Sequence, residues 1–210
     1  MESRSYRSPR RAAQAARTRE AVLAASQQLF LLHGWAGATI AAIAGAAGVS
    51  SETIYAGFGS KRAILRELVL RAVRGDEPDQ PLIEQRGPRR IAAESDQARQ
   101  IELFAADISG VLERVAPLMD VARAATVTDD AMAQLYAGFH SGRRENLEWF
   151  AEALMKNGRL KGGADARAVA ATLWRLASPD LYLLMRRVEG CSREAYADWL
   201  ATSLKRLLLE

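Results

Sequence analysis

Apolar residues recur at helical spacing along almost the whole chain, and no stretch alternates apolar and polar residues convincingly at a period of two. In the first periodic segment, roughly residues 11–33, one helical face collects Val22, Ser26, Leu29, Phe30 and His33. Apolar residues make up 49% of the 210-residue chain, which excludes a mainly disordered protein. The pattern therefore predicts an all-α fold of about nine helices.

Glycines and capping residues divide the N-terminal third into four expected helices. Gly34 is a natural C-terminal cap for the first helix, and Thr39 and Ser50 are expected N-caps of two short helices. Gly48 separates the two short helices, and a fourth helix is expected over residues 61–74.

The segment 75–88 holds three prolines and two glycines, which is typical of an irregular connection. It predicts a domain boundary, with one domain over residues 1–75 and a larger helical domain over residues 76–210. Within the first domain, residues 1–10 are expected to form a disordered arm.

Four further helical regions are expected beyond this connection, over residues 90–127, 128–157, 165–187 and 192–208. Pro117 is expected to interrupt the first of them and Pro179 to kink the third, because proline removes a helical hydrogen bond. Thr128 and Ser192 are the expected N-caps of the second and fourth.

Basic residues concentrate in the N-terminal third. Residues 1–75 carry eleven Lys and Arg against four Asp and Glu, a net charge of +7, and residues 76–210 carry a net charge of −3. This asymmetry favours a polyanion partner at one end of the molecule, although a solvated basic surface without a partner would give the same charges.

The sequence contains no pattern typical of a membrane span or of a signal for export. No run approaches about eighteen uninterrupted apolar residues, and no apolar stretch of the signal-peptide type follows the basic N-terminus. The single cysteine, Cys191, cannot form an internal disulfide. A cytoplasmic protein without a membrane partner is therefore expected.

The two short helices are joined by the turn Ala47-Gly48-Val49-Ser50, which is the sequence form of a DNA-binding helix-turn-helix. Glycine permits the positive φ of the turn, valine fills the corner, and serine begins the second helix. That second helix must be short and outwardly polar to enter a major groove about 12 Å wide.

The stretch from Thr39 to Lys61, TIAAIAGAAGVSSETIYAGFGSK, resembles the DNA-binding signature of the TetR family of regulators. The preceding Leu29-Phe30 and His33-Gly34, and the following Leu65, fit the same pattern, so that the resemblance covers about the first 75 residues. Residues 173–182, with Tyr196 and Trp199, are similar to one subgroup of the family.

The resemblance implies roles for particular positions. Thr39, Tyr55 and Lys61 are expected to contact DNA phosphates, and the start of the recognition helix is expected to reach base edges through Ser50, Ser51, Glu52 and Thr53. The alternatives are capping alone for Thr39 and Ser50, a packed ring for Tyr55 and a solvated lysine at position 61.

Two positions depart from the family pattern. Gly57 stands where relatives often carry an aromatic residue or histidine, which puts one phosphate contact in doubt. Glu52 would be repelled by phosphates, so it either accepts from a cytosine amino group or favours the positive end of the helix dipole, and we prefer the second.

The N-terminal arm has two interpretations. Its arginines are Arg4, Arg7, Arg10 and Arg11. They could enter the minor groove, but a disordered, weakly attracted terminus is the preferred interpretation.

Dimerisation is expected because one helix-turn-helix touches too few bases to define an operator, whereas two related by a dyad bind adjacent half-sites. As in the family, the last helices are the expected interface. Its candidate residues are Leu173, Leu176, Leu184, Trp199, Leu200, Leu204 and Leu207. The alternative for each is ordinary core.

The middle helices carry aromatic, methionine and leucine residues that could line an apolar cavity for a small-molecule effector. They are Phe104, Ile108, Leu112, Met119, Met132, Tyr136, Phe139, Trp149 and Trp174, with His140 or Asn146 as a polar anchor. The competing hypothesis is a filled core, since such stripes at helical spacing are usually core.

Together these features predict a ligand-responsive transcriptional regulator that binds a palindromic operator as a homodimer and is released by a largely apolar small molecule. The alternative is a ligand-independent architectural DNA-binding protein. No metal-ligand spacing, phosphate loop or nucleophile elbow is present in the sequence, so neither enzymatic activity nor a cofactor is expected.

Overall fold

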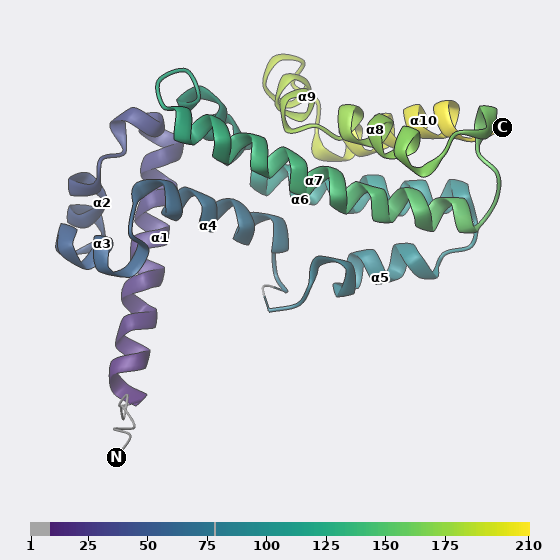
Figure 1. The fold of residues 1–210 in the computed structure, drawn as a ribbon. Helices are drawn as coiled ribbons and strands as arrows, with labels where there is room; N and C mark the ends of the chain where they lie inside the picture. The colour runs from purple at the N-terminus through teal and green to yellow at the C-terminus, as the bar shows by residue number, and fades with distance from the viewer. Residues whose placement is uncertain (1–8, 78) are drawn as a thin grey trace. The chain divides into compact units, whose positions relative to one another are not determined.

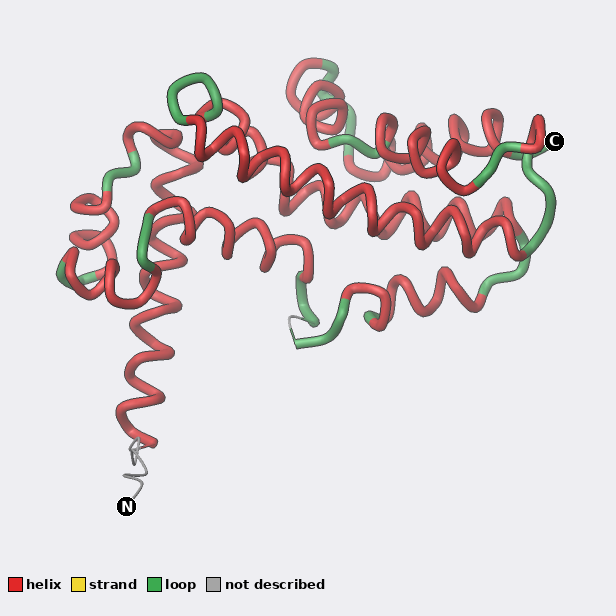
Figure 2. The backbone as a smooth tube through the Cα atoms, viewed as in Figure 1, coloured by secondary structure: helices red, strands yellow, loops and turns green. Residues whose placement is uncertain are grey.

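The computed structural model describes residues 9–77 and 79–210 (Figure 1). The described residues form α-helices and short helical turns without a strand, which confirms the all-α prediction (Figure 2). The chain divides into two compact units, Met1–Leu68 and Val69–Glu210. Among the described helices, none combines the length and apolar character needed to cross a membrane.

The first unit is built from four helices, α1 (Pro9–Gly37), α2 (Ile40–Ala47), α3 (Ser51–Phe58) and the start of α4 (Lys61–Arg74). The division between the units falls inside α4, and the predicted boundary after residue 75 lies just past the end of this helix. Inside α1 the helical geometry breaks at Gly34, with φ of 65° and ψ of −172°, where a C-terminal cap was expected. The core of this unit includes Val22, Leu23, Phe30, Ile43, Ile54, Ile64 and Leu65.

The two expected N-caps of the helix-turn-helix are confirmed. The Thr39 hydroxyl accepts from the Ala42 amide at 3.1 Å, and the Ser50 hydroxyl accepts from the Thr53 amide at 3.2 Å. Gly48 ends α2 in the left-handed region, with φ of 67° and ψ of 33°. Local chemistry therefore sets the start of α3 and the turn before it.

The second unit is arranged around one long helix. Its helices after α4 are α5 (Arg86–Ala93), α6 (Gln97–Ala125), α7 (Asp130–Lys156), α8 (Ala166–Leu176), α9 (Pro179–Leu183) and α10 (Arg193–Leu208). Helix α6 contacts α5, α7, α9 and α10, and α8 packs on α7 (Figure 1). Phe104 of α6 stacks on Phe150 of α7 with ring centroids 4.1 Å apart. The core of the unit therefore lies along α6.

The prolines of the second unit behave differently from the prediction. Pro117 lies inside α6, which continues through it. The packing of α6 against four helices can offset the loss of one hydrogen bond. Pro179 does not kink a helix, because α8 has already ended and Pro179 opens α9 after the cap Ser178. Pro88 belongs to α5, so the irregular connection ends earlier than predicted.

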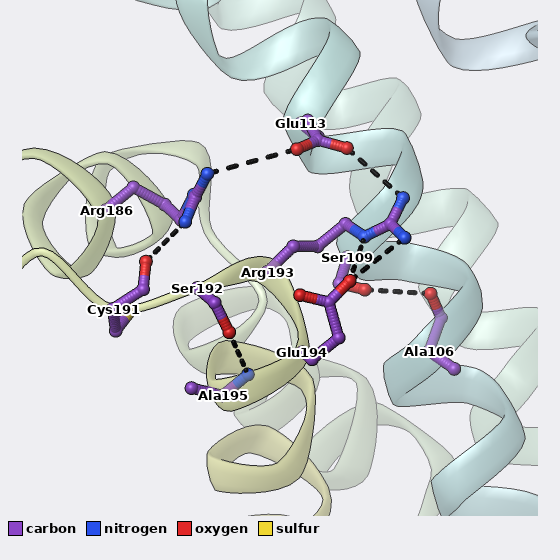
Figure 3. Close-up of polar contacts among 9 residues, drawn as sticks. All are labelled: Ala106, Ser109, Glu113, Arg186, Cys191, Ser192, Arg193, Glu194 and Ala195. Carbon is purple, nitrogen blue, oxygen red and sulfur yellow. Dashed lines mark hydrogen bonds and ion pairs between the residues drawn. The ribbon is translucent and has the colours of Figure 1, made fainter.

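A network of arginines fixes the segment before α10 (Figure 3). Arg193 donates to Glu113 of α6 at 3.2 Å, and Arg186 lies 4.0 Å from the same carboxylate. Arg186 also donates to the carbonyl of Cys191. The hydroxyl of Ser192 accepts from the Ala195 amide at 3.0 Å, so the predicted cap of the last helix is confirmed.

The start of α7 corrects another prediction. Asp129, not Thr128, is its N-cap, because the Asp129 carboxylate accepts from the Ala131 and Met132 amides at 2.9 and 3.2 Å. The Thr128 hydroxyl instead donates to the carbonyl of Ala125 at 3.4 Å. A carboxylate serves the exposed amides of a helix start as well as a hydroxyl does, which is why neighbouring caps are hard to rank from sequence.

This assignment predicts that Asp129→Ala lowers the free energy of unfolding by about 1 kcal/mol, because two amides at the start of α7 lose their acceptor. Thr128→Ala is the matched control and should change it by much less. Urea unfolding followed by circular dichroism measures both. Equal losses for the two variants would contradict the assignment of the cap.

Candidate nucleic-acid interface and apolar cavity

Helix α3 is held in the unit by one buried side chain and exposes polar side chains on its other faces. Ile54 is fully buried in the first unit, whereas Glu52 and Thr53 are exposed and Ser51 is half-buried. Tyr55 is 54% exposed, so its ring is not packed in the core. The first two turns of α3 can therefore meet an external surface without disturbing the fold.

The polar groups at the start of α3 are already organised by the helix. Besides capping α3, the Ser50 hydroxyl lies 3.2 Å from the hydroxyl of Thr53. A hydrogen bond from its own backbone amide lowers the pKa of the exposed Glu52, and the Ser50 hydroxyl lowers it further. This agrees with the interpretation that Glu52 favours the helix N-terminus.

Lys61 has a partner inside the first unit. Its ammonium donates to the carbonyl of Trp35 at 2.6 Å and lies 4.2 Å from the centroid of the Trp35 ring. The phosphate contact expected for Lys61 thus competes with a cation–π contact and a hydrogen bond at the end of α1. The sequence carries a tryptophan after the Gly34 cap, but nothing in its spacing indicated this pairing.

Arg19 is a positioning residue that the sequence did not reveal. From α1 it donates to Glu67 of α4 at 3.1 Å and to the carbonyl of Gly57 at 3.0 Å. Its guanidinium also lies 4.3 Å from the centroid of the Phe58 ring. These contacts tie the C-terminal end of α3 to α1 and α4, so they hold the orientation of the exposed α3 surface.

The basic arm falls mostly beyond what the structure describes. Arg4 and Arg7 lie outside the described residues, as does the rest of the segment 1–8. Arg10 and Arg11 belong to the first turn of α1 and are exposed, so the helix begins before the predicted end of the arm.

Comparison with known proteins agrees with this geometry. Residues 22–68 match the family described as bacterial regulatory proteins, tetR family. The first unit carries a tetR-family DNA-binding domain. The matched residues include both short helices, both caps and the Gly48 turn. Comparison with curated proteins gives no match.

The fold of this chain resembles that of several solved transcriptional regulators over nearly its whole length. A TetR transcriptional regulator from Chloroflexus aurantiacus is 20% identical, with a TM-score of 0.67, covering 93% of this chain and 98% of that one. NalD of Pseudomonas aeruginosa is 20% identical, with a TM-score of 0.66 and coverages of 94% and 98%. A protein from Saccharomonospora viridis, described as a transcriptional regulator in complex with choline, is 19% identical, with a TM-score of 0.69 and coverages of 93% and 99%.

The second unit contains an apolar cavity of about 220 Å³. Among the residues named from the sequence, those that line it are Phe104, Ile108, Leu112, Met119, Phe139, Asn146 and Trp149. Sequence reasoning missed the contribution of α4, whose residues Val69, Leu70 and Val73 also line the cavity. The sequence placed residues 61–74 in a helix of the N-terminal domain and assigned them no part in a ligand site.

The other predicted ligand residues lie elsewhere in the second unit. Met132 is fully buried in the core. Tyr136 and Trp174 flank His140, with ring centroids 4.5 and 5.5 Å from its ring. Burial lowers the pKa of His140, and Arg143 lowers it further. His140 therefore belongs to an aromatic cluster and is not among the residues that line this cavity.

The candidate dimer residues separate into two groups. Leu173, Leu200 and Leu204 are fully buried within the second unit, so they are core residues of a single chain. Leu176 and Trp199 are half-buried, and Leu184 is 48% exposed. Two further apolar residues are exposed, Val188 at 75% and Leu207 at 54%.

The Lys61 geometry predicts that Lys61→Met lowers the free energy of unfolding by about 1–3 kcal/mol, because the Trp35 carbonyl loses a charged donor. Arg62→Met, at the neighbouring exposed position, is the control and should leave it nearly unchanged. Urea unfolding measures both. Parental stability of Lys61→Met, together with a loss of about one unit in the salt slope of DNA binding, would show that Lys61 serves a phosphate instead.

Proposed function

We propose that this protein is a ligand-responsive transcriptional repressor that binds a palindromic operator as a homodimer and leaves it when a small molecule binds. The observation that carries the proposal concerns α4. Its first turns belong to the DNA-binding unit, and its last turns line the cavity of the second unit through Val69, Leu70 and Val73. One continuous helix therefore joins the two functions.

The DNA side of the proposal rests on α3. Its exposed Glu52, Thr53 and Tyr55, beside Ser51, offer side chains to a major groove, and Thr39 at the start of α2 is exposed for a phosphate. A single such helix reads too few bases, so two copies would bind half-sites about 34–36 Å apart. Such a regulator would act in the cytoplasm.

The dimer side of the proposal rests on exposed apolar residues near the C-terminus. Leu184 and Val188 follow α9, and Leu207 lies in the last turn of α10. Leu184 and Val188 share one helical turn, and large apolar side chains left together in water are typical of an interface. We propose that they pair with the same residues of a second copy.

The sensing side of the proposal rests on the open cavity. A filled core would have favoured an architectural DNA-binding protein, whereas a cavity with apolar walls offers a place for an effector. NalD is described as a secondary repressor of a multidrug efflux pump, and the S. viridis protein holds choline. Those relatives support repression and small-molecule binding as the mode proposed here.

The proposed switch is a shift between two states of the dimer. An effector touching the last turns of α4 would favour a state in which the helix moves and the spacing of the recognition helices no longer fits the operator. Such coupling amounts to about 1–3 kcal/mol, which corresponds to an operator affinity lowered about 5- to 150-fold.

The experiment that tests the proposal is footprinting on the DNA upstream of the protein's own gene, combined with sedimentation of the protein alone. A protected palindrome and a dimer are expected. A monomer at micromolar concentration, without salt-sensitive affinity for any duplex, would overturn the proposal.

Tyr55→Phe should weaken operator binding about fivefold, because one hydroxyl-to-phosphate hydrogen bond is lost while the ring remains. Tyr136→Phe, in the second unit, is the control and should bind like the parent. Fluorescence anisotropy with a labelled operator measures both. Parental affinity of Tyr55→Phe would remove the hydroxyl of Tyr55 from the interface.

A further inference from the structure

Arg143, a half-buried arginine, stands among the mostly apolar residues that line the cavity of the second unit. Arg143 of α7 contributes to the wall, and its Nε is buried without a hydrogen-bond partner. Its terminal nitrogens contact the carbonyl of Trp174 and, at 3.3 Å, the Nδ1 of His140. Neither of these partners carries a negative charge, so the guanidinium is solvated by neutral groups alone.

No carboxylate in the described part of the chain forms an ion pair with Arg143. The carboxylate that acts on it through space is that of Asp180, which lies 3.4 Å from Arg123. Burial lowers the pKa of Arg143 to about 10, with Asp180 and Tyr196 opposing the shift and Arg144 adding to it. Arg143 is therefore still a cation at neutral pH, and a cation that burial has partly desolvated is unfavourable without a counter-ion.

The other charged group of the cavity wall is Asp107, which already faces a cation. Burial raises the pKa of Asp107, and the Arg114 guanidinium opposes that rise, whereas Glu77 adds to it. Arg114 is itself held by a hydrogen bond from its Nε to the carbonyl of Ala72 at 2.9 Å. The cation that acts on Asp107 is therefore bonded only to a neutral carbonyl, whereas the carboxylate that acts on Arg143 is already paired with Arg123.

We propose that this cavity binds a small molecule with an apolar body and one anionic head group, and that the head group accepts hydrogen bonds from Arg143. This inference rests on the proposed function, because it names the chemical class of the effector. The body would lie against the apolar wall, which includes the stacked rings of Phe104 and Phe150. The same wall includes Val69, Leu70 and Val73, so a ligand bound in the cavity would contact α4.

A charged acceptor is favoured here for two reasons. A carboxylate would supply a counter-charge to the guanidinium, and hydrogen bonds between ionised groups are the stronger kind. A neutral or cationic head group of the same size would leave the guanidinium uncompensated, and a cation would also be repelled by it.

The test compares ligands that differ only in their head groups, with the full-length protein and isothermal titration calorimetry. One series is octanoate, octanol and octylammonium, and a second has phenylpropionate with the matching alcohol and ammonium ion. In at least one series the carboxylate should bind about tenfold more tightly than its two partners. Equal affinity for carboxylate and alcohol, a preference for the ammonium ion, or no binding of either carboxylate would overturn the proposal.

Two neighbouring variants assign the preference to one residue. Arg143→Gln should abolish the preference for the carboxylate, whereas Arg144→Gln should keep it. Arg144 is a suitable control because it lies at the same 5.0 Å from the Trp174 ring as Arg143 but does not line the cavity. A preference retained by Arg143→Gln would overturn the role of Arg143. If that variant does not fold, the head-group series with the parent protein decides the ligand class.

A DNA-release experiment distinguishes failure of this inference from failure of the function on which it rests. The carboxylate that binds in calorimetry is added to the complex of protein and operator, and it should release the DNA. Binding of the carboxylate without DNA release would support the ligand class and count against the proposed sensing. An operator complex that responds only to the ammonium ion would keep the sensing and overturn the anionic class.

Discussion

The continuity of α4 is the constraint on which the rest of this structure depends. An α-helix transmits a displacement along its axis, since each turn is bonded to the next. In this protein one helix of 14 residues starts in the DNA-binding unit and ends in the wall of a cavity. Its first half buries Ile64 and Leu65 in one unit, and its second half is used by the other. In the proposed switch, an effector that moves Val69 or Val73 would displace the helix that also carries Ile64 and Leu65.

The net charge of the N-terminal unit does not show which cations bind groups of their own unit and which are free to attract DNA. Arg19 and Lys61 are bound to groups of their own unit, Glu67 and the Trp35 carbonyl among them. They hold the end of α3 and the start of α4, so the contacts they make within the unit are structural. The polar side chains at the exposed start of α3 are the ones proposed to contact the operator.

The cavity combines apolar walls with a cation that has no counter-ion. Sequence periodicity identified several of its wall residues, because Ile108, Leu112 and Phe139 share the inward faces of two long helices. The same periodicity could not separate wall from core, so Met132 was grouped with them although it is fully buried. Arg143 was not identified at all, since a charged residue on a helix is ordinarily solvated.

The sequence alone determined where most helices begin and end and where the DNA-binding motif lies. Caps such as Thr39 and Ser50 and the left-handed Gly48 act through hydrogen bonds and backbone angles within a few residues, so they are visible in a single stretch of chain. Only the tertiary structure decided that Leu200 is core while Leu184 faces outward, and that Pro117 continues a helix while Pro179 begins one. Those outcomes depend on which helices pack around α6, and contacts between segments far apart in sequence leave no local pattern.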